Sequence, residues 1–331
     1  MIEVRNLTKR YGKHVAVDNL NFTVQKGQIY GFLGPNGAGK STTMNIITGY
    51  IGLSEGEVLV NGHDILDEPE KAKSFIGYLP EQPPLYGDMT VKEYLEFAAE
   101  LKKLPKAGIS NAIGEAMELT KVEDVKDRLI RNLSKGYRQR VGLAQAILGF
   151  PEIIILDEPT VGLDPKQIIE MRELIRSFAG EHTVILSSHI LSEVQEICDH
   201  LLIIHRGRLI ASGTPEKLEQ QVRTAELELV VKSDDAGKVQ AIFSGMPDIE
   251  KLSVREAENG EITVKLEPRE DVDVREAVFY ACADAGVPLL MMKNSGMSLE
   301  TIFLELTSDK NGAAEKINFQ SEEEKTDDGD L

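Results

Sequence analysis

The sequence predicts an α/β fold up to about residue 215, followed by a small α+β domain. Over the first part, short apolar runs alternate with helical patterns. Residues 153–156 are apolar at every position, which is typical of a strand buried on both faces of a largely parallel sheet covered by helices. After Thr214-Pro215 the chain begins again with alternating strand patterns.

Strands of the first domain are expected in "QIYGFLG", "EVLVNG", "EIIILDEP", "TVILSSH" and "LLIIHRGRLIASG". Between Thr90 and about Gly149 the spacing of apolar residues is helical throughout. Thr90 and Glu93 form a capping-box pattern at the start of this stretch. The sequence therefore predicts a helical subdomain at about residues 90–149, inserted in the sheet.

The C-terminal domain is expected at residues 221–306. Its strands are "AELELVVK", the two arms of a hairpin turning at Asn259-Gly260, and "PLLMMK". Its helices are a stretch near Val239 to Phe243, "DVREAVFYACADAG" and "SLETIFLELT". Residues 307–331 are acidic and almost without apolar anchors, so we expect a disordered tail.

Composition excludes several classes of protein. The chain has 331 residues, 37 Lys and Arg against 55 Asp and Glu, and a formal charge of −18. This charge argues against binding to nucleic acid or to an anionic lipid surface. The two cysteines, Cys198 and Cys282, indicate a reducing compartment and no disulfide framework. No apolar run approaches the length needed to span a bilayer.

The stretch "GPNGAGKST" fits the phosphate-loop pattern and lies between a predicted strand and a predicted helix. Its glycines let several backbone N–H groups face one anion, and the helix N-terminus adds a positive end. Lys40 is expected on the β- and γ-phosphates and the Ser41 hydroxyl on Mg²⁺. The expected nucleotide-binding residues are Gly34, Pro35, Asn36, Gly37, Ala38, Gly39, Lys40, Ser41 and Thr42. The alternative is an accidental glycine-rich turn.

Two carboxylates follow the buried strand of "EIIILDEP". Asp157 is expected to hold Mg²⁺ through water, and Glu158 to orient and deprotonate the attacking water as general base. Without the phosphate loop, two adjacent acids at a strand end could merely cap the next turn.

Two further side chains are candidates for the nucleotide site. His189 ends the strand "TVILSSH", at the carboxyl edge where ligands of parallel sheets bind, and is expected to contact the γ-phosphate. A structural histidine is the alternative. Tyr11 could stack on adenine or simply pack.

A second anion-seeking helix start lies in the helical subdomain, in "LSKGYRQR". Ser134 is the expected N-cap and Gly136 permits close approach to the backbone. This helix start is expected to be too far from the phosphate loop to share its phosphate. It could close over the nucleotide of a second subunit.

Together these motifs resemble the ATP-binding cassette (ABC) proteins, which have a P-loop NTPase nucleotide-binding domain of ABC type. The resemblance covers residues 1–220 and includes "GPNGAGKST", "LSKGYRQR", "IIILDEP", "GLD" at residues 162–164, and His189. It implies two nucleotide-binding domains joined head to tail around two ATP molecules. Each site would combine one chain's phosphate loop with Ser134 and Gly136 of the other chain, with Asp164 in cross-talk between the sites.

Two departures from the family pattern stand out. The commonest signature is LSGGQ, and this chain has Lys135 and Tyr137 in place of a glycine and the glutamine. The family's glutamine loop aligns with Glu81, where a carboxylate could face Mg²⁺ and the attacking water. The alternative for Glu81 is a polar loop residue.

With "IGYLPEQPPLY", "LSKGYRQR" and a small C-terminal domain ending "SLETIFLELT", the chain is similar to ATP-binding subunits of bacterial multidrug or antibiotic exporters. It implies an ATPase with ATP and Mg²⁺ as cofactors, working as a homodimer or heterodimer with separate transmembrane permease subunits at the cytoplasmic face of the membrane. A short helix of the permease would bind in a groove near Glu81. The alternatives are a soluble ABC ATPase acting on ribosomes or DNA, and a regulatory ATP binder that does not hydrolyse.

Overall fold

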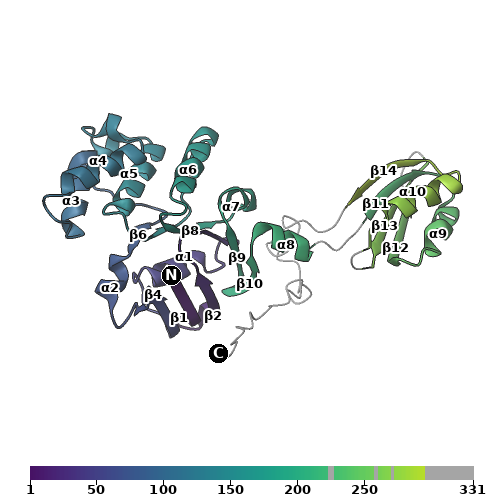
Figure 1. Cartoon of the computed structure of the whole chain (residues 1–331), viewed down its shortest axis with the longest axis horizontal. Helices are drawn as coiled ribbons and strands as arrows, with labels where there is room; N and C mark the ends of the chain where they lie inside the picture. The colour runs from purple at the N-terminus through teal and green to yellow at the C-terminus, as the bar shows by residue number, and fades with distance from the viewer. Residues whose placement is uncertain (223–226, 257–259, 270–271, 295–331) are drawn as a thin grey trace, which may run out of the picture. The chain divides into compact units, whose positions relative to one another are not determined.

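The computed structural model describes residues 1–222, 227–256, 260–269 and 272–294. The chain divides between Pro215 and Glu216 into two compact units (Figure 1). Within the described residues, no helix is long and apolar enough to cross a bilayer. The predicted helix at residues 298–307 and the predicted tail at residues 307–331 lie outside the described part of the chain.

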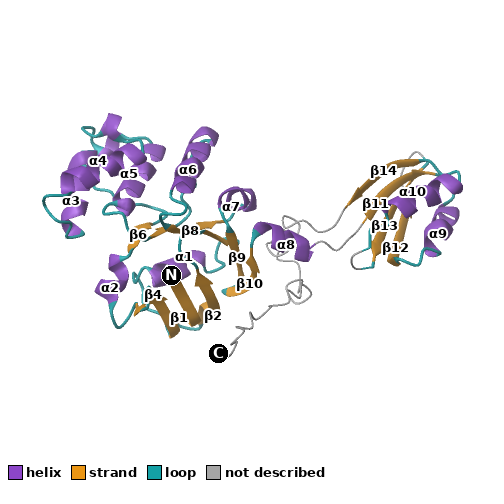
Figure 2. Ribbon diagram, in the orientation of Figure 1, coloured by secondary structure: helices purple, strands orange, loops and turns teal. Residues whose placement is uncertain are grey.

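The first unit contains two sheets (Figure 2). Five strands of the larger sheet run parallel and the sixth, β10, pairs antiparallel with β9. In spatial order these strands are β10 (Arg208–Gly213), β9 (His200–His205), β3 (Ile29–Leu33), β8 (Thr183–Ser188), β7 (Ile153–Leu156) and β6 (Ile76–Leu79). All residues of β3, β7 and β8 are buried, which for β7 confirms the prediction from its unbroken apolar character.

The smaller sheet is antiparallel and was not expected. Its order is β2 (His14–Val24), β1 (Ile2–Tyr11), β4 (Glu55–Val60) and β5 (His63–Asp64). The strand predicted at "EVLVNG" forms β4, which pairs antiparallel with β1 and belongs to this smaller sheet. β1 and β2 alternate between buried and exposed residues, with register shifts that break the simple pattern.

A single apolar core joins the two sheets of this unit. It contains side chains of β1, β2 and β4, of helix α1 (Lys40–Ile47), and of β3, β7 and β8. α1 therefore packs between the sheets, with Met44, Ile46 and Ile47 fully buried. Burial on both sides fixes the helix that begins with Lys40.

Helices cover the rest of the unit. They are α2 (Pro69–Ser74), α3 (Val91–Leu101), α4 (Ile109–Leu119), the short 3-10 helices η1 (Glu123–Val125) and η2 (Ile130–Asn132), α5 (Lys135–Ile147), α6 (Pro165–Ser177) and α7 (Leu191–Ile197). Figure 1 shows α3, α4 and α5 grouped at one end and β1, β2 and β4 at the other. The capping box at Thr90 and Glu93 is confirmed, since Thr90 Oγ1 accepts from the Glu93 N–H at 3.2 Å and Glu93 Oε2 accepts from the Thr90 N–H at 2.8 Å.

Helix α8 (Pro215–Val222) begins where the units divide, and the second unit continues with a β-α-β-β-α-β order. Its elements are β11 (Leu227–Lys232), α9 (Ala236–Ser244), β12 (Ile249–Glu256), β13 (Glu261–Pro268), α10 (Arg275–Asp284) and β14 (Leu289–Asn294). The sheet order β12-β13-β11-β14, all antiparallel, is the ferredoxin-like arrangement. α9 and α10 share one core with the inward faces of β11 and β13.

Candidate active site

The phosphate loop joins the buried strand β3 to the first residue of α1. Gly37 and Gly39 have φ angles of 80° and 108°, in the left-handed region that favours glycine. A Cβ at Gly34 would lie 2.3 Å from the carbonyl oxygen of Ile204, so the loop also needs glycine for close backbone approach. These three positions fix a tight loop over the N-terminus of α1, which is the local requirement for cradling an anion.

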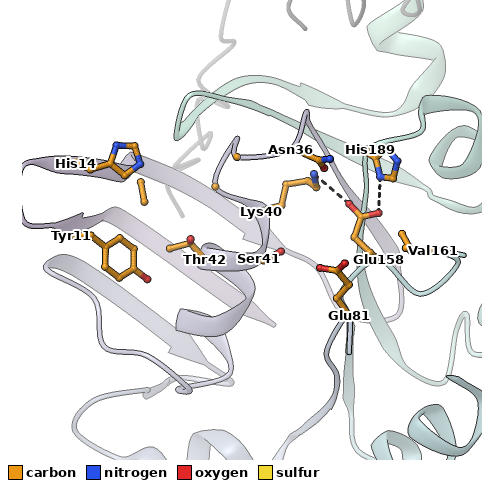
Figure 3. A pocket seen from close by; sticks show the side chains of 13 residues that line it. Tyr11, His14, Asn36, Lys40, Ser41, Thr42, Glu81, Glu158, Val161 and His189 are labelled. Atoms are coloured by element: carbon orange, nitrogen blue, oxygen red, sulfur yellow. Dashed lines mark hydrogen bonds and ion pairs between the residues drawn. The ribbon is translucent and has the colours of Figure 1, made fainter. Parts of the chain in front are cut away.

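Lys40 is held within the loop. It is only 5% exposed, and its Nζ donates to the carbonyl oxygens of Gly34 at 2.7 Å and Pro35 at 3.3 Å. The same ammonium lies 3.3 Å from Oε1 of Glu158 (Figure 3). The ammonium therefore connects the loop to the carboxylate that follows β7.

Ser41 lines the cavity, and Asp157 lies directly beneath it. Ser41 Oγ donates to Asp157 Oδ1 at 3.1 Å, and Ser187 Oγ donates to the same oxygen at 2.6 Å. Hydroxyl and carboxylate oxygens are the ligands that Mg²⁺ prefers, and in phosphate sites Mg²⁺ takes one or two of them plus phosphate and water. The hydroxyl of Ser41, at the start of the helix that follows the phosphate loop, and the carboxylate of Asp157 fit a cation shared with a nucleotide.

Glu158 lies between two partners of different chemistry. Its Oε1 faces the Lys40 ammonium, and its Oε2 lies 2.9 Å from Nδ1 of His189. Because a carboxylate only accepts, Nδ1–H of the imidazole is the donor. Glu158 has a φ of 49°, a left-handed conformation that is uncommon for a residue with a side chain. Such conformations persist where surrounding contacts hold them, and here Ser187 Oγ accepts from the Glu158 N–H at 2.8 Å.

Lys40, Ser41, Glu158 and His189 line one open cavity of about 560 Å³, a size typical of small-molecule sites. Ten of the residues predicted from the sequence line it: Tyr11, Asn36, Gly37, Gly39, Lys40, Ser41, Thr42, Glu81, Glu158 and His189. The exposed Glu81 lies on the side of Ser41 and Glu158, and the Tyr11 ring lies at the far end (Figure 3). That ring is 50% exposed, with Lys9 Nζ 5.1 Å from its centroid, so it is available for stacking and is not core packing.

Other predicted residues lie outside this cavity. Gly34, Pro35 and Ala38 shape the loop from behind, and Asp157 is buried beneath Ser41. Ser134, Gly136 and Asp164 do not line the cavity at all.

Ser134 and Asp164 instead cap two neighbouring helices. Ser134 is the N-cap of α5 and accepts from the Tyr137 N–H at 3.4 Å, and Asp164 is the N-cap of α6 in a capping box with Gln167. A Cβ at Gly136 would lie 2.6 Å from the Gln167 side chain, so the first turns of α5 and α6 touch. The signature stretch therefore lies against the "GLD" segment of the same chain.

Three lining residues were missed by the sequence reasoning: His14, Ala16 and Val161. No motif marks them, and His14 is brought to the cavity because it pairs with Tyr11 across the β1–β2 hairpin. The supporting hydroxyl of Ser187 was also missed. Two serines directly before His189, at the end of an otherwise apolar strand, are the signal that could have indicated it.

Comparison with known proteins identifies the family. A family model described as ABC transporter matches residues 17–161. The bacitracin transport ATP-binding protein of Bacillus licheniformis is 35% identical over 308 residues, which cover 92% of this chain and 97% of that protein. The chain belongs to the ABC transporter ATP-binding proteins.

Solved ABC structures agree with this assignment. One, the ATP-binding subunit of an ABC transporter, matches 67% of this chain and 92% of its own with a TM-score of 0.62 and 32% identity. A dimeric bacterial ABC transporter cassette matches 65% of this chain and 98% of its own with a TM-score of 0.59 and 27% identity. The predicted ABC cassette fold and the predicted role as an ATP-binding subunit of an ABC transporter are confirmed. ABC ATP-binding subunits bind and hydrolyse ATP to power transport, form dimers and work with membrane permeases.

Proposed function

We propose that this ABC subunit closes on ATP as a pair of cassettes, each site shared between two chains. The cavity of one chain supplies Lys40, Ser41, Glu158 and His189. The partner cassette supplies Ser134 and Gly136, with Asp164 between the two sites. Two observations support this division: Ser134 lies outside the cavity of its own chain, and Ser134 is exposed.

In the proposed reaction, Glu158 accepts a proton from the attacking water as the water oxygen bonds to the γ-phosphorus. The bond from the γ-phosphorus to the bridging oxygen breaks, and ADP leaves with the bond's electron pair. Lys40 neutralises the phosphate oxygens, and His189 holds the Glu158 carboxylate and contacts the γ-phosphate. The left-handed backbone of Glu158 and its two partners support the assignment as base.

We assign the Mg²⁺ that accompanies ATP to Ser41 and Asp157, with Glu81 facing it from the open side of the cavity. When bound, the cation would supply charge neutralisation on the phosphates. The Ser41–Asp157 contact of 3.1 Å, between two oxygen donors beside the phosphate loop, supports this assignment.

The subunit is proposed to drive an exporter whose permease is a separate membrane protein, with a permease helix in the groove near Glu81. The relative named for bacitracin transport, similar over nearly its whole length, supports this. The proposed location is the cytoplasmic face of the membrane, and the net charge of −18 supports the proposal that nucleic acid is not a partner.

We assign residues 1–220 to the cassette and 221–306 to an accessory domain that supports dimerisation or regulation.

Glu158, held between Lys40 and His189, is the single observation that carries the proposed function. The proposal that each nucleotide site is shared between two chains is tested by mixing two inactive variants, Lys40→Ala and Ser134→Arg. A heterodimer of these keeps one site with an intact cavity and an intact signature. For a homodimer with random exchange, about a quarter of wild-type ATPase activity should return in an equal mixture.

The matched control mixes Lys40→Ala with Glu158→Gln. Both residues lie in the cavity of one chain, so every pairing leaves no complete cavity, and no activity should return. Equal recovery in both mixtures, or none in the first, would count against a site shared between chains.

A further inference from the structure

A buried carboxylate outside the cavity joins the two segments that carry the proposed catalytic pair. Glu193, on α7, is only 5% exposed. Its Oε2 accepts from Thr160 Oγ1 at 2.8 Å and from Ser188 Oγ at 3.0 Å, and both hydroxyl-bearing residues are buried. These two hydrogen bonds satisfy the buried carboxylate, which would destabilise the fold if it were left without partners.

The two hydroxyls come from segments near the ends of two different strands. Thr160 stands two residues after Glu158, beyond the end of β7, and Ser188 is the last residue of β8, directly before His189. Ser188 Oγ also accepts from the Ile190 N–H at 3.1 Å, so the turn that carries His189 is bonded on both sides. One carboxylate thus clamps together the backbone segments that bring Glu158 and His189 to 2.9 Å.

A cation on a third element balances the buried charge. Arg172, on α6, approaches Oε1 of Glu193 at 3.7 Å. Its other terminal nitrogen binds Glu196, whose side chain is 61% exposed. Arg172 therefore has one buried and one exposed acidic partner, and both partners lie on α7.

We infer that Glu193 is a positioning residue for the Glu158–His189 pair, held in place by Arg172 of α6. This inference rests on the proposed role of Glu158. Glu193 does not line the cavity, and its hydrogen bonds go to Thr160 and Ser188. It therefore acts by orienting Glu158 and His189. Nucleotide affinity depends on Lys40 and the phosphate loop and should not change. Small displacements of reacting groups lower the rate without weakening binding.

The test compares Glu193→Gln with Glu196→Gln in the full chain. Both changes neutralise a partner of Arg172 on the same helix, but only the first reaches Thr160 and Ser188. For Glu193→Gln we expect kcat for ATP to fall about 10-fold or more while KM stays within about twofold. Glu196→Gln should keep kcat within about twofold of wild type. A wild-type kcat for Glu193→Gln, or equal losses in both variants, overturns the inference.

A second pair keeps the test decisive if Glu193→Gln fails to fold. Thr160→Val removes the hydroxyl and should lower kcat with KM unchanged, whereas Thr160→Ser retains the hydroxyl and should restore kcat. Equal kcat values for these two variants overturn the inference. Glu158→Gln, assayed in the same experiment, separates the two proposals. If Glu158→Gln keeps wild-type activity, the proposed function is wrong. If Glu158→Gln is inactive while the Glu193 and Thr160 variants keep wild-type kcat, only the proposed role of Glu193 is wrong.

Discussion

The phosphate-loop side and the signature side of the first unit hold their key residues in opposite ways. On the first side, Lys40, Asp157 and Glu158 are at most 7% exposed. Lys40 forms an ion pair with Glu158, and Asp157 accepts a hydrogen bond from Ser41. On the second, Ser134 and Asp164 are exposed and bond only within the first turn of their own helices. In the proposed function, the half of the nucleotide site that contains Lys40 is preorganised by burial, and the other half is the exposed Ser134 of a partner cassette.

The difference shows how a helix cap can serve stability and binding together. The Ser134 hydroxyl satisfies one N–H of the first turn of α5, and the remaining N–H groups keep the positive end of the helix available to an anion. The buried side has no such freedom, because each of its charges already has a partner within the chain.

The largest expected effect is on the buried side. Glu158→Gln removes the proposed general base but keeps the size of the side chain, so kcat should fall about 100-fold or more while ATP binding is retained. ATPase rates and nucleotide binding measured on the same preparation check this. Gln82→Glu, a change at an exposed position outside the lining residues, is the control and should leave kcat unchanged. An unaltered rate for Glu158→Gln would remove Glu158 from the mechanism.

The next prediction concerns the stability of α5, the helix that begins after Ser134, and the partly buried ion pair that attaches it to α6. Arg140, on α5, is 7% exposed and binds Glu170 of α6 at 2.5 Å and the Thr120 carbonyl at 3.2 Å. Arg140→Met should lower the free energy of unfolding by about 2 kcal/mol, less than for a fully buried pair because Glu170 is partly exposed. Denaturant titration measures this.

The control for that change is the other cation beside Glu170. Lys166 lies 3.9 Å from Glu170 and its side chain is 87% exposed. Lys166→Met should change the unfolding free energy by less than about 0.5 kcal/mol. A loss as large as that of Arg140→Met would mean that burial does not decide the contribution of these pairs.

A smaller effect distinguishes the signature cap from an ordinary cap. Ser134→Ala and Thr90→Ala each remove a serine or threonine N-cap, of α5 and α3 respectively, and each should cost about 1 kcal/mol of stability. Only Ser134→Ala should also lower ATPase activity, because only that helix start is proposed to face a nucleotide. Equal ATPase rates for the two variants would reduce Ser134 to a structural cap.

An effect of similar size concerns the C-terminus of α5, the helix that begins at the signature stretch. Burial lowers the pKa of Lys102 from 10.5 to about 8, and its Nζ donates to the carbonyl oxygens of Ala146 and Leu148 at the C-terminus of α5. Between pH 8 and 10 the unfolded lysine binds a proton that the folded one has lost. This group therefore makes stability rise with pH in that window, by about 1 kcal/mol per pH unit at most.

Thermal or denaturant unfolding at pH 7, 8 and 9 checks this contribution. Relative to wild type, Lys102→Met should lose stability as pH rises above 8, because methionine does not titrate. Lys103→Met, at a side chain that is 84% exposed, should follow the wild-type curve. A constant difference between wild type and Lys102→Met would contradict the lowered pKa.

Much of the site was predictable because its groups lie in short contiguous motifs. The loop from Gly34 to Ser41 and the Asp157-Glu158 pair each sit at the junction of a strand with the next element, so spacing along the chain already sets their chemistry. The helix starts at Thr90 and Ser134 were predictable for the same reason, since a cap involves residues only three apart.

Contacts between distant segments could not be predicted this way. β4 joins β1 and not the parallel sheet, because pairing depends on which apolar surfaces meet in the folded core. Ser187 and Glu193 support Glu158 and Thr160 from about 30 residues away in sequence, and nothing in their own neighbourhood identifies those partners.

The sequence by itself thus determined which groups are proposed for phosphate, cation and water chemistry, because those functions need specific groups at fixed short spacings. Tertiary structure decided which of these groups are buried together and which stay exposed. That division arises because burial and hydrogen bonding depend on long-range packing of the strands and helices, which no local pattern specifies.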